Sequence, residues 1–513
     1  MQADAKSLAV LLENFLAETP SAVLIENGAV LFDLRQARYS LSTEHDKCVL
    51  HLWSGERNTV RRVLSAEMKN GALRLHVMRF GQARPSHLDI CPNRDSRTPS
   101  SRKAARTDYE QRLQRVLELK FPGFKIPRLT SAMDLEQSFG PVYARGVLHR
   151  GRSAFAVVGV NAGETQASVD GALTCGILWL DACRFSDATA RLQVEGLKLF
   201  VPPGTSELTR ERMARLNLNA AKWHLYEFDE REDEFREIDT ADRGNVATRL
   251  VHCPDVNAAR ERFAHSISRV QALFGDADVV PLTPSEIAFR WHGLEFARAR
   301  TVFAPGSFRP GEEIVFGVGP AETILDESNE QDLVALVQRM KEARQPHAHR
   351  GNLLWRMHPE RWLESLVTRN VADLDERVDP TFVYSQVPAF SASDRAMIDV
   401  LTVTLNGRLA VIELKAEEDI HLPLQGLDYW TRVEWHHTRG EFQRMGYFPG
   451  RELSPERPLL FLVAPALHVH PVTDVLLHYV SPELDWTLIG IDEHWREGIR
   501  VVFRKRPERS AAA

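Results

Sequence analysis

The sequence has few or none of the features that mark several common classes of protein. Its 513 residues include five dispersed cysteines and no CxxC pair, so neither a zinc site nor a disulfide framework is predicted. A reducing, cytoplasmic setting is the simplest expectation for such a chain. No uncharged apolar run reaches the 18 residues expected of a membrane span, so no membrane partner is predicted. The apolar N-terminal stretch contains Asp4 and Glu13, which fit an amphipathic helix better than a signal peptide.

The common catalytic and nucleotide-binding signatures are also missing. No GxxxxGK[ST] loop, strand-linked GxGxxG, HExxH or GxSxG motif occurs, so the sequence does not support ATP-driven, dinucleotide-dependent, zincin or serine-hydrolase chemistry. The net charge is −6, so any surface that binds nucleic acid must be a local patch. The length predicts several domains, and the hydrophobic content of 43% is that of an ordinary globular protein. The strand and helix patterns along the chain predict the α/β class.

The stretch from Asp399 to Tyr429 concentrates the chemistry that is present. Residues 397–405 and 408–415 are rich in Val, Ile, Leu and Thr and are separated by Asn406-Gly407, which predicts a β-hairpin. Glu413 and Lys415 are two apart on the second strand and therefore project from one face. Since an Asp and a Glu on paired strands beside a Lys can hold a hard divalent cation and act on a phosphate, this hairpin is the candidate active site.

The hairpin register decides whether the two acids meet. With Asn406-Gly407 as the whole loop, Asp399 would pair with Leu414, and Asp399 and Glu413 would face opposite sides of the sheet. Sharing one metal requires one extra residue in the register. We therefore expect either a three-residue loop with Gly407 in the left-handed region or a bulge near Asp399.

The ordered set of Asp399, Glu413-Leu414-Lys415 and Gln425-x-x-x-Tyr429 resembles the PD-(D/E)xK nuclease superfamily, in its RecB-type branch with the QxxxY motif. Mismatch endonucleases of that branch have a similar run of residues. The superfamily tends to carry a Glu on the preceding helix, and Glu364 in PERWLESLV fits that position. One departure is Ile398 in place of Pro before Asp399.

The resemblance implies a role for each of these residues. Asp399, Glu413 and the backbone carbonyl of Leu414 would bind Mg²⁺ or Mn²⁺, and Glu364 would complete the shell or bind a second ion. Lys415 would orient the attacking water, help to deprotonate it or stabilise the transition state.

Gln425 and Tyr429 lie four apart on one face of a predicted helix and can therefore point together into the site. By resemblance, they position Lys415 and the DNA backbone.

A second region matches the hairpin without its chemistry. RGVLHRGRSAFAVVGVNAGE (145–164) aligns with DVLTVTLNGRLAVIELKAEE (399–418), and WHLYEFDE (223–230) aligns with WTLIGIDE (486–493). The alignment places four residues opposite Glu364, Asp399, Glu413 and Lys415, namely Glu110, Arg145, Gly159 and Asn161. Because these residues cannot reproduce a carboxylate pair and a lysine, we interpret the region as a degenerate duplicate.

The predicted organisation has five parts. They are a small β-rich module at 1–95, a basic linker at 96–107, a degenerate nuclease-like domain at 108–235, a mixed α/β connecting module at 236–350 and a nuclease-like domain at 351–513. The last of these should be restriction-endonuclease-like, with a mixed central sheet flanked by helices. Basic residues are predicted to form a backbone-binding patch, namely Arg344, His347, His349, Arg350 and Arg504–Arg506.

The leading hypothesis is a Mg²⁺-dependent DNA nuclease of repair, restriction or defence type, a hydrolase of phosphodiester bonds. The alternative is a non-catalytic nucleic-acid-binding scaffold built on nuclease-like folds. The sequence leaves open DNA against RNA, endonuclease against exonuclease, and monomer against homodimer.

Overall fold

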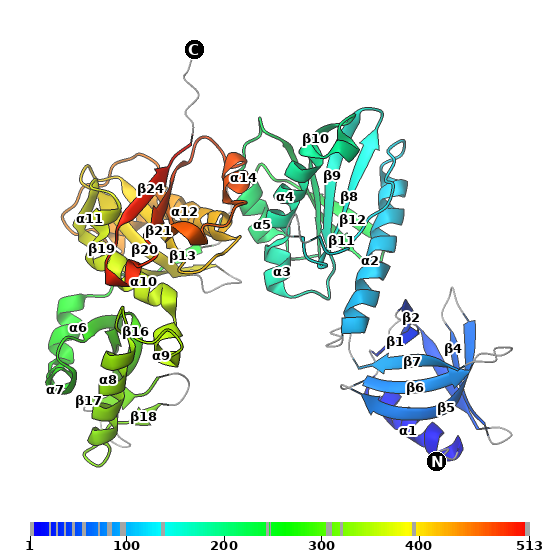
Figure 1. Cartoon of the computed structure of the whole chain (residues 1–513), viewed down its shortest axis with the longest axis horizontal. Coiled ribbons are helices and arrows are strands. Elements are labelled where there is room, and N and C mark those ends of the chain that lie inside the picture. Colours follow the sequence, from blue (N-terminus) through cyan, green and yellow to red (C-terminus); the bar gives the residue numbers. More distant parts are fainter. Residues whose placement is uncertain are drawn as a thin grey trace. The chain divides into compact units, whose positions relative to one another are not determined.

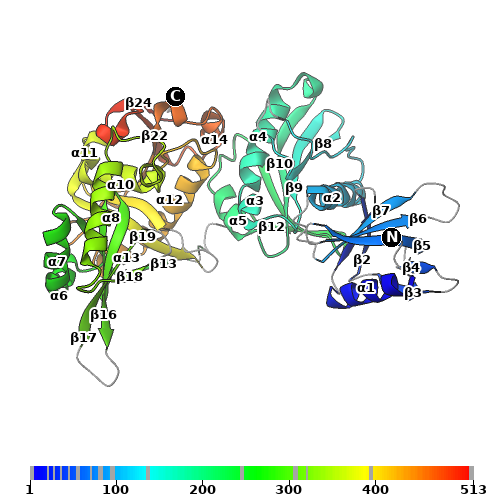
Figure 2. The same cartoon turned by 60° about the horizontal axis from the view of Figure 1, so that its bottom comes forward.

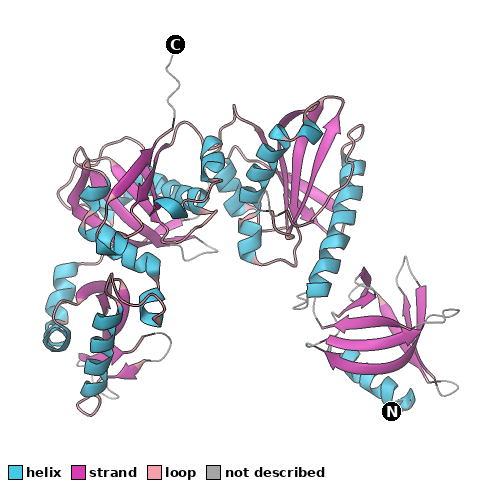
Figure 3. Cartoon of the chain, viewed as in Figure 1, coloured by secondary structure: helices cyan, strands magenta, loops and turns pink. Residues whose placement is uncertain are grey.

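The computed structural model describes residues 5–507, apart from 20–21, 27–28, 35–36, 44–46, 54–57, 70–71, 79–84, 93–98, 135–138, 243–245, 247, 304–309, 319–321 and 392–396. The chain divides into two compact units, Met1–Ala214 with Leu218–Asp242, and Arg215–Asn217 with Arg243–Ala513. The described strands form four sheets, two in each unit, which confirms a multi-domain α/β protein (Figures 1 and 3). Across the described part of the chain, no helix has both the length and the apolar composition that a membrane crossing requires.

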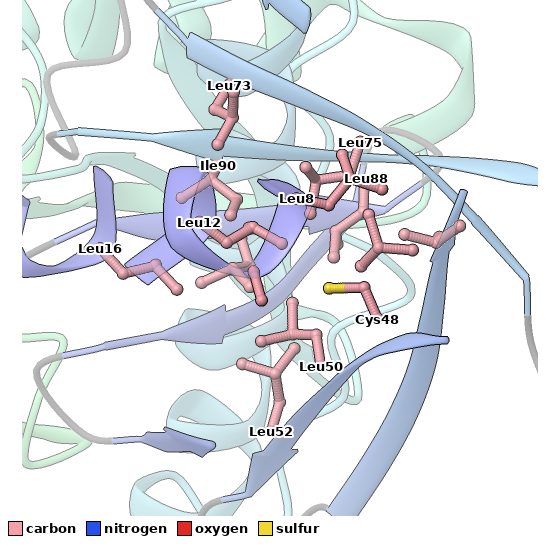
Figure 4. Close-up of a cluster of buried hydrophobic side chains, with 14 of the residues drawn as sticks. Leu8, Leu12, Leu16, Cys48, Leu50, Leu52, Leu73, Leu75, Leu88 and Ile90 are labelled. Atoms are coloured by element: carbon pink, nitrogen blue, oxygen red, sulfur yellow. The ribbon is translucent and has the colours of Figure 1, made fainter. Parts of the chain in front are cut away.

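The N-terminal module is an antiparallel sheet with one helix packed on it. Helix α1 spans Ala5–Glu18. The sheet has the order β2-β1-β7-β6-β5-β4-β3, and its strands are β1 (Val23–Glu26), β2 (Ala29–Asp33), β3 (Arg38–Ser42), β4 (Cys48–Trp53), β5 (Asn58–Lys69), β6 (Ala72–Met78) and β7 (Ser86–Cys91). Leu8, Leu12 and Leu16 recur at helical spacing and pack on alternate strand residues such as Leu50 and Leu52 (Figure 4).

Helix α2 runs through most of the predicted basic linker at 96–107. It begins at Pro99 and continues to Lys120, while 96–98 lie outside the described residues. Pro is tolerated at the first position of a helix, and the following Lys, Arg and Ala residues are strong helix formers. Ala104 packs into a small cluster with residues of the N-terminal module.

The first α/β domain is a five-stranded mixed sheet of order β12-β11-β10-β9-β8. Its strands are β8 (Tyr143–Arg150), β9 (Ser153–Val160), β10 (Gln193–Val201), β11 (Lys222–Asp229) and β12 (Glu234–Ile238), and its further helices are α3 (Gln166–Asp170), α4 (Ala172–Phe185) and α5 (Glu207–Met213). Strands β9, β10 and β11 are parallel, while β8 and β12 run antiparallel to their neighbours.

The middle module is an antiparallel meander of order β14-β15-β16-β17-β18 with helices packed on it. Its elements are α6 (Val256–Arg262), α7 (Ala264–Phe274), β14 (Asp278–Thr283), β15 (Glu286–Trp291), β16 (Leu294–Phe303), β17 (Pro310–Phe316), β18 (Thr323–Ile324) and α8 (Glu330–Ala343). Its core is separate from that of the C-terminal domain.

The C-terminal domain has a seven-stranded mixed sheet of order β13-β19-β20-β21-β22-β23-β24. Its strands are β13 (Thr248–Leu250), β19 (Val378–Ser391), β20 (Met397–Thr404), β21 (Leu409–Leu414), β22 (Leu459–Pro465), β23 (Asp485–Ile491) and β24 (Val501–Lys505). Its helices are α9 (Leu353–Arg356), α10 (Pro359–Arg369), α11 (Val371–Leu374), α12 (Leu422–Thr438), α13 (Glu441–Arg444) and α14 (Thr473–His478). Figure 2 shows α10 and α12 in this domain from a second direction.

The two α/β sheets share one strand order. The series β8 to β12 and β20 to β24 have the same neighbours and the same parallel or antiparallel directions. The crossover helices α4 and α12 each carry a glycine at the closest approach to the sheet. A Cβ on Gly176 would lie 2.7 Å from Leu197 Cδ2, and one on Gly426 would lie 2.4 Å from Leu462 Cδ2. The predicted agreement in strand order is therefore present.

Candidate active site

The β20–β21 hairpin has the register that places its two acids on one face. Val400 pairs with Ile412 and Val403 with Leu409, so Asp399 lies opposite Glu413. The loop has three residues, because the Thr404 N–H donates to the Arg408 carbonyl at 2.8 Å. Gly407 has φ +86°, in the left-handed region. The expectation of a three-residue loop is confirmed, and no bulge interrupts the β20–β21 pairs.

The two carboxylates and the lysine converge. The Leu414 N–H donates to Asp399 Oδ2 at 3.0 Å, and Lys415 Nζ donates to Glu413 Oε1 at 3.1 Å. Glu413 is 1% exposed, and its Oε2 has no hydrogen-bond partner among the described residues. A buried carboxylate oxygen without a partner is costly, so a cation or a proton at this atom would be stabilising.

Burial favours the neutral forms of both acids, and for Glu413 the charge of Asp399 adds to it. Burial raises the pKa of Asp399, and the Leu414 N–H and Lys415 only partly oppose this shift. Burial, followed by the charge of Asp399, raises the pKa of Glu413 well above its usual range. A cation between them would remove both penalties.

Lys415 is held in its charged form. Burial lowers its pKa, but the charges of Glu413 and Glu360 outweigh burial, so that the net pKa is raised. Glu360 Oε1 lies 4.0 Å and Asp419 Oδ2 3.8 Å from Lys415 Nζ. An ammonium in this setting can donate hydrogen bonds and neutralise negative charge, which favours those two roles over proton abstraction.

Glu364 reaches the site through an unpredicted residue, Gln386. Gln386 Nε2 donates to Glu364 Oε2 at 2.6 Å and to Asp399 Oδ1 at 3.4 Å, and Arg361 Nη1 donates to Glu364 Oε2 at 3.1 Å. Burial, with a smaller contribution from Asp399, raises the pKa of Glu364 to about 7. Glu364 therefore belongs to this cluster, on the preceding helix as expected.

Gln386 has an unusual backbone. It lies opposite Asp399 in the β19–β20 ladder, because Ser385 pairs with Val400 and Val387 with Ile398. Its φ of +52° is rare for a residue other than glycine, and such conformations cluster at functional sites. Its strand contains several other polar residues, including the adjacent Ser385, and no known motif singles out Gln386.

Helix α12 brings Gln425 and Tyr429 to the same site. The absence of a side chain at Gly426 lets the helix approach the sheet, and a Cβ there would lie 3.6 Å from Glu413 Cβ. Burial, followed by the charges of Glu413 and Asp399, raises the pKa of Tyr429. Gln425 Oε1 is buried without a hydrogen-bond partner in the described structure. Both residues lie on the helix that follows the hairpin, and Tyr429 is near enough to the two acids for their charges to raise its pKa.

The donor set fits a hard divalent cation. Asp399 and Glu413 supply carboxylate oxygens, one of which lacks a partner, and Mg²⁺ is commonly held by one or two carboxylates together with waters and phosphate oxygens. Within the described residues, no cluster of three or more His, Cys, Asp and Glu side chains has metal-binding geometry. A cation here would therefore depend on ligands besides these side chains, and the predicted Leu414 carbonyl is one such ligand.

The corresponding place in the first α/β domain has different residues from those predicted. Its hairpin turn contains two residues, since Arg150 pairs with Ser153, so Arg145 lies opposite Val158. The alignment at Arg145 holds, but Val158 and Val160, rather than Gly159 and Asn161, correspond to Glu413 and Lys415. Gly159 faces α2, where a Cβ would lie 2.4 Å from the Tyr109 hydroxyl.

Arg145 occupies that place as a buried cation. It is 2% exposed and donates to the carbonyls of Gly140 at 3.0 Å and Tyr143 at 3.1 Å. Its guanidinium lies 5.8 Å from the Trp179 ring, and the position of Gly176 relative to Gly426 makes Trp179 the counterpart of Tyr429. The hairpin here presents a guanidinium and a valine, so it has no carboxylate pair.

The predicted basic patch is partly wrong. Arg344 is fully buried and donates to the carbonyls of His292, Leu354 and Met357, each at 2.7 Å, so its role is structural. Arg504 donates to the Leu374 carbonyl at 2.7 Å. Arg344 therefore cannot belong to a surface patch.

No protein-family model matches the chain, and no curated protein matches it.

Proposed function

We propose that residues 351–513 form a metal-dependent nuclease domain that hydrolyses phosphodiester bonds in DNA, with Mg²⁺ or Mn²⁺ as cofactor. The observation that carries the proposal is the Asp399–Glu413 pair, which lies on one face of the hairpin with Lys415 Nζ 3.1 Å from Glu413 and with Glu413 Oε2 unpartnered. Repair, restriction or defence are the settings in which such an activity would act. The five free cysteines agree with the proposed cytoplasmic location.

The residues divide the work by position. Asp399 and Glu413, with the Leu414 carbonyl, would hold the cation, which when bound lowers the pKa of a water and stabilises charge on the phosphate. Lys415 would donate a hydrogen bond to the attacked phosphate and stabilise its negative charge. Gln386 orients Asp399 and Glu364 through its single amide group. Tyr429 and Gln425 cover the site from α12.

We further propose that the first α/β domain is a degenerate copy of the second. The shared strand order, the paired glycines of α4 and α12 and the matching Trp223 and Trp486 segments support this origin. Since Arg145 replaces the first acid, this copy would serve as a scaffold or a binding surface. Catalysis would then belong to the C-terminal copy.

The test is incubation of the full chain with single-stranded, duplex, branched and mismatched DNA, and with RNA, in Mg²⁺, Mn²⁺ or EDTA. Cleavage of one or more substrates that requires a divalent ion supports the proposal. Binding without cleavage of any substrate would favour the alternative, a non-catalytic nucleic-acid-binding scaffold.

A further inference from the structure

A cavity of about 280 Å³ lies between the middle module and the first turn of α10. Three guanidinium groups line it, from Arg290 on β15, Arg298 on β16 and Arg361 on α10. Water occupies about 30 Å³ per molecule in the liquid, so the cavity has room for a phosphate group. The hairpin prediction gave no indication of this cavity, because its two sides are about 70 residues apart in the sequence.

Arg290 has the loosest ion pair of the three arginines. Arg298 pairs with Glu295 at 2.6 Å and with Glu286 at 3.2 Å, and Arg361 pairs with Glu364 at 3.1 Å. The ion pair of Arg290 with Glu295 is 3.7 Å long. The Arg290 side chain is 16% exposed, so its charge is poorly solvated as well as loosely paired. Planar guanidinium groups bind phosphate oxygens in a bidentate manner, and a phosphate would satisfy Arg290.

The middle module holds these arginines at a fixed distance from α10. Gly293 has φ +74°, and a Cβ there would lie 2.0 Å from the Arg361 carbonyl, so the tip of the β15–β16 hairpin is in close contact with α10. Arg344 fastens the same tip by donating to the His292 carbonyl and also to the carbonyl of Met357, just before α10. The cavity is therefore preorganised.

The cavity is connected to the catalytic carboxylates by a short series of contacts. Arg361 donates to Glu364, Gln386 donates to Glu364, and Gln386 also donates to Asp399. One wall of the cavity thus belongs to the same hydrogen-bonded cluster as the proposed metal site. Arg361, Glu364 and Gln386 would link a group bound in the cavity to Asp399.

We propose that this cavity binds a phosphate group of the substrate strand, next to the phosphodiester bond that lies at Asp399 and Glu413. The inference rests on the proposed function and extends it, because it makes the middle module part of the substrate site. The phosphate is either an internal one of the strand or a terminal monophosphate. Both sources share the chemistry that Arg290, Arg298 and Arg361 recognise.

The first test measures binding of inorganic phosphate to the full chain by calorimetry. Arg290→Gln and Arg298→Gln should each weaken phosphate binding about tenfold, the typical effect of losing one charge-assisted hydrogen bond. Arg300→Gln is the matched control, since Arg300 is on the same strand as Arg298, is paired with Glu313 at 2.6 Å and does not line the cavity. Equal affinities in all four proteins would overturn the assignment.

The second test uses a substrate that the wild-type protein cleaves, prepared with a 5′-phosphate or a 5′-hydroxyl. Arg290→Gln should raise KM about tenfold and leave kcat nearly unchanged. An effect on both substrates identifies an internal phosphate, and an effect on the 5′-phosphorylated substrate alone identifies a terminal one. An unchanged KM on both would refute the inference while the nuclease activity stands, whereas phosphate binding without any cleavage would refute only the nuclease.

Discussion

At the scale of single residues, the site is defined by buried carboxyl groups. Glu364 and Glu413 are 5% and 1% exposed, and Asp399 is largely enclosed with them. Buried carboxyl groups favour their neutral forms unless a cation is near. The buried carboxyl groups that suit the site to hold a metal therefore make the stability of the metal-free protein depend on pH.

Glu364 provides the measurable consequence. Its pKa in the folded protein is about 7 against an ordinary 4.5, so the folded state keeps a proton that the unfolded state has released. Its contribution to stability is therefore fully present below pH 4.5 and is lost as the pH rises to about 7. The difference between those values corresponds to roughly 3 kcal/mol.

We expect the free energy of unfolding in EDTA to fall between about pH 5 and pH 7.5, and Glu364→Gln to remove up to roughly 3 kcal/mol of that fall. Urea unfolding at the two pH values measures it. Glu418→Gln, at an exposed acid, should leave the fall unchanged. A Glu364→Gln variant with the full wild-type dependence would show that Glu364 is not the titrating group.

At the scale of elements, the β20–β21 turn sets the register of the site. Gly407 is needed twice, for its φ of +86° and because a Cβ would lie 2.4 Å from the Glu452 carbonyl oxygen. Gly450 also has a left-handed backbone, with φ +73°, but a Cβ there would meet no other atom. A substitution at Gly450 therefore measures the cost of the backbone conformation alone.

Gly450→Ala should destabilise the protein by about 1–2 kcal/mol, the cost of a left-handed residue. Gly407→Ala should cost roughly 1–3 kcal/mol more, because its methyl group meets backbone. Denaturant unfolding of the two variants gives the comparison. Equal losses would mean that the turn accommodates a side chain and that the contact with Glu452 does not constrain the register.

Sequence patterns predicted this hairpin and the helix that follows it, but not the residues that neighbouring elements contribute to the site. The hairpin, the three-residue loop and the helix of Gln425 and Tyr429 follow from local spacing and from the requirement that two acids meet. Gln386 was missed because it comes from a neighbouring strand with no motif of its own. The predicted match of Gly159 with Glu413 was wrong by one residue. The turn after Arg150 has two residues and the turn after Thr404 has three, a difference that the aligned sequences do not show.

At the scale of the whole molecule, the two α/β domains share a strand order but have residues of opposite charge at the corresponding place on the β8–β9 and β20–β21 hairpins. One has Arg145 opposite Val158, and the other has Asp399 opposite Glu413. If the first is a degenerate copy, only the second of the two copies keeps a carboxylate pair at this place. The helix in the basic segment before the first domain was not predicted, because the sequence of α2 has no amphipathic pattern.

Calorimetric titration with Mn²⁺ should detect binding that Glu413→Gln abolishes and Arg145→Lys leaves unchanged. The first variant removes a ligand, and the second keeps the charge of a residue that already acts as an internal cation. Mn²⁺ binding that survives Glu413→Gln with the wild-type stoichiometry would place the metal elsewhere in the chain.

The most direct test of the nuclease proposal is cleavage by Asp399→Asn and Glu413→Gln in Mg²⁺, compared with the wild type and with Glu418→Gln. Each active-site variant should lose at least about a thousandfold in rate, as expected for loss of a metal ligand, while Glu418→Gln cleaves normally. DNA binding in Ca²⁺ should remain within a few-fold of wild type for all four proteins. Cleavage at the wild-type rate by both Asp399→Asn and Glu413→Gln would contradict the assignment of this site.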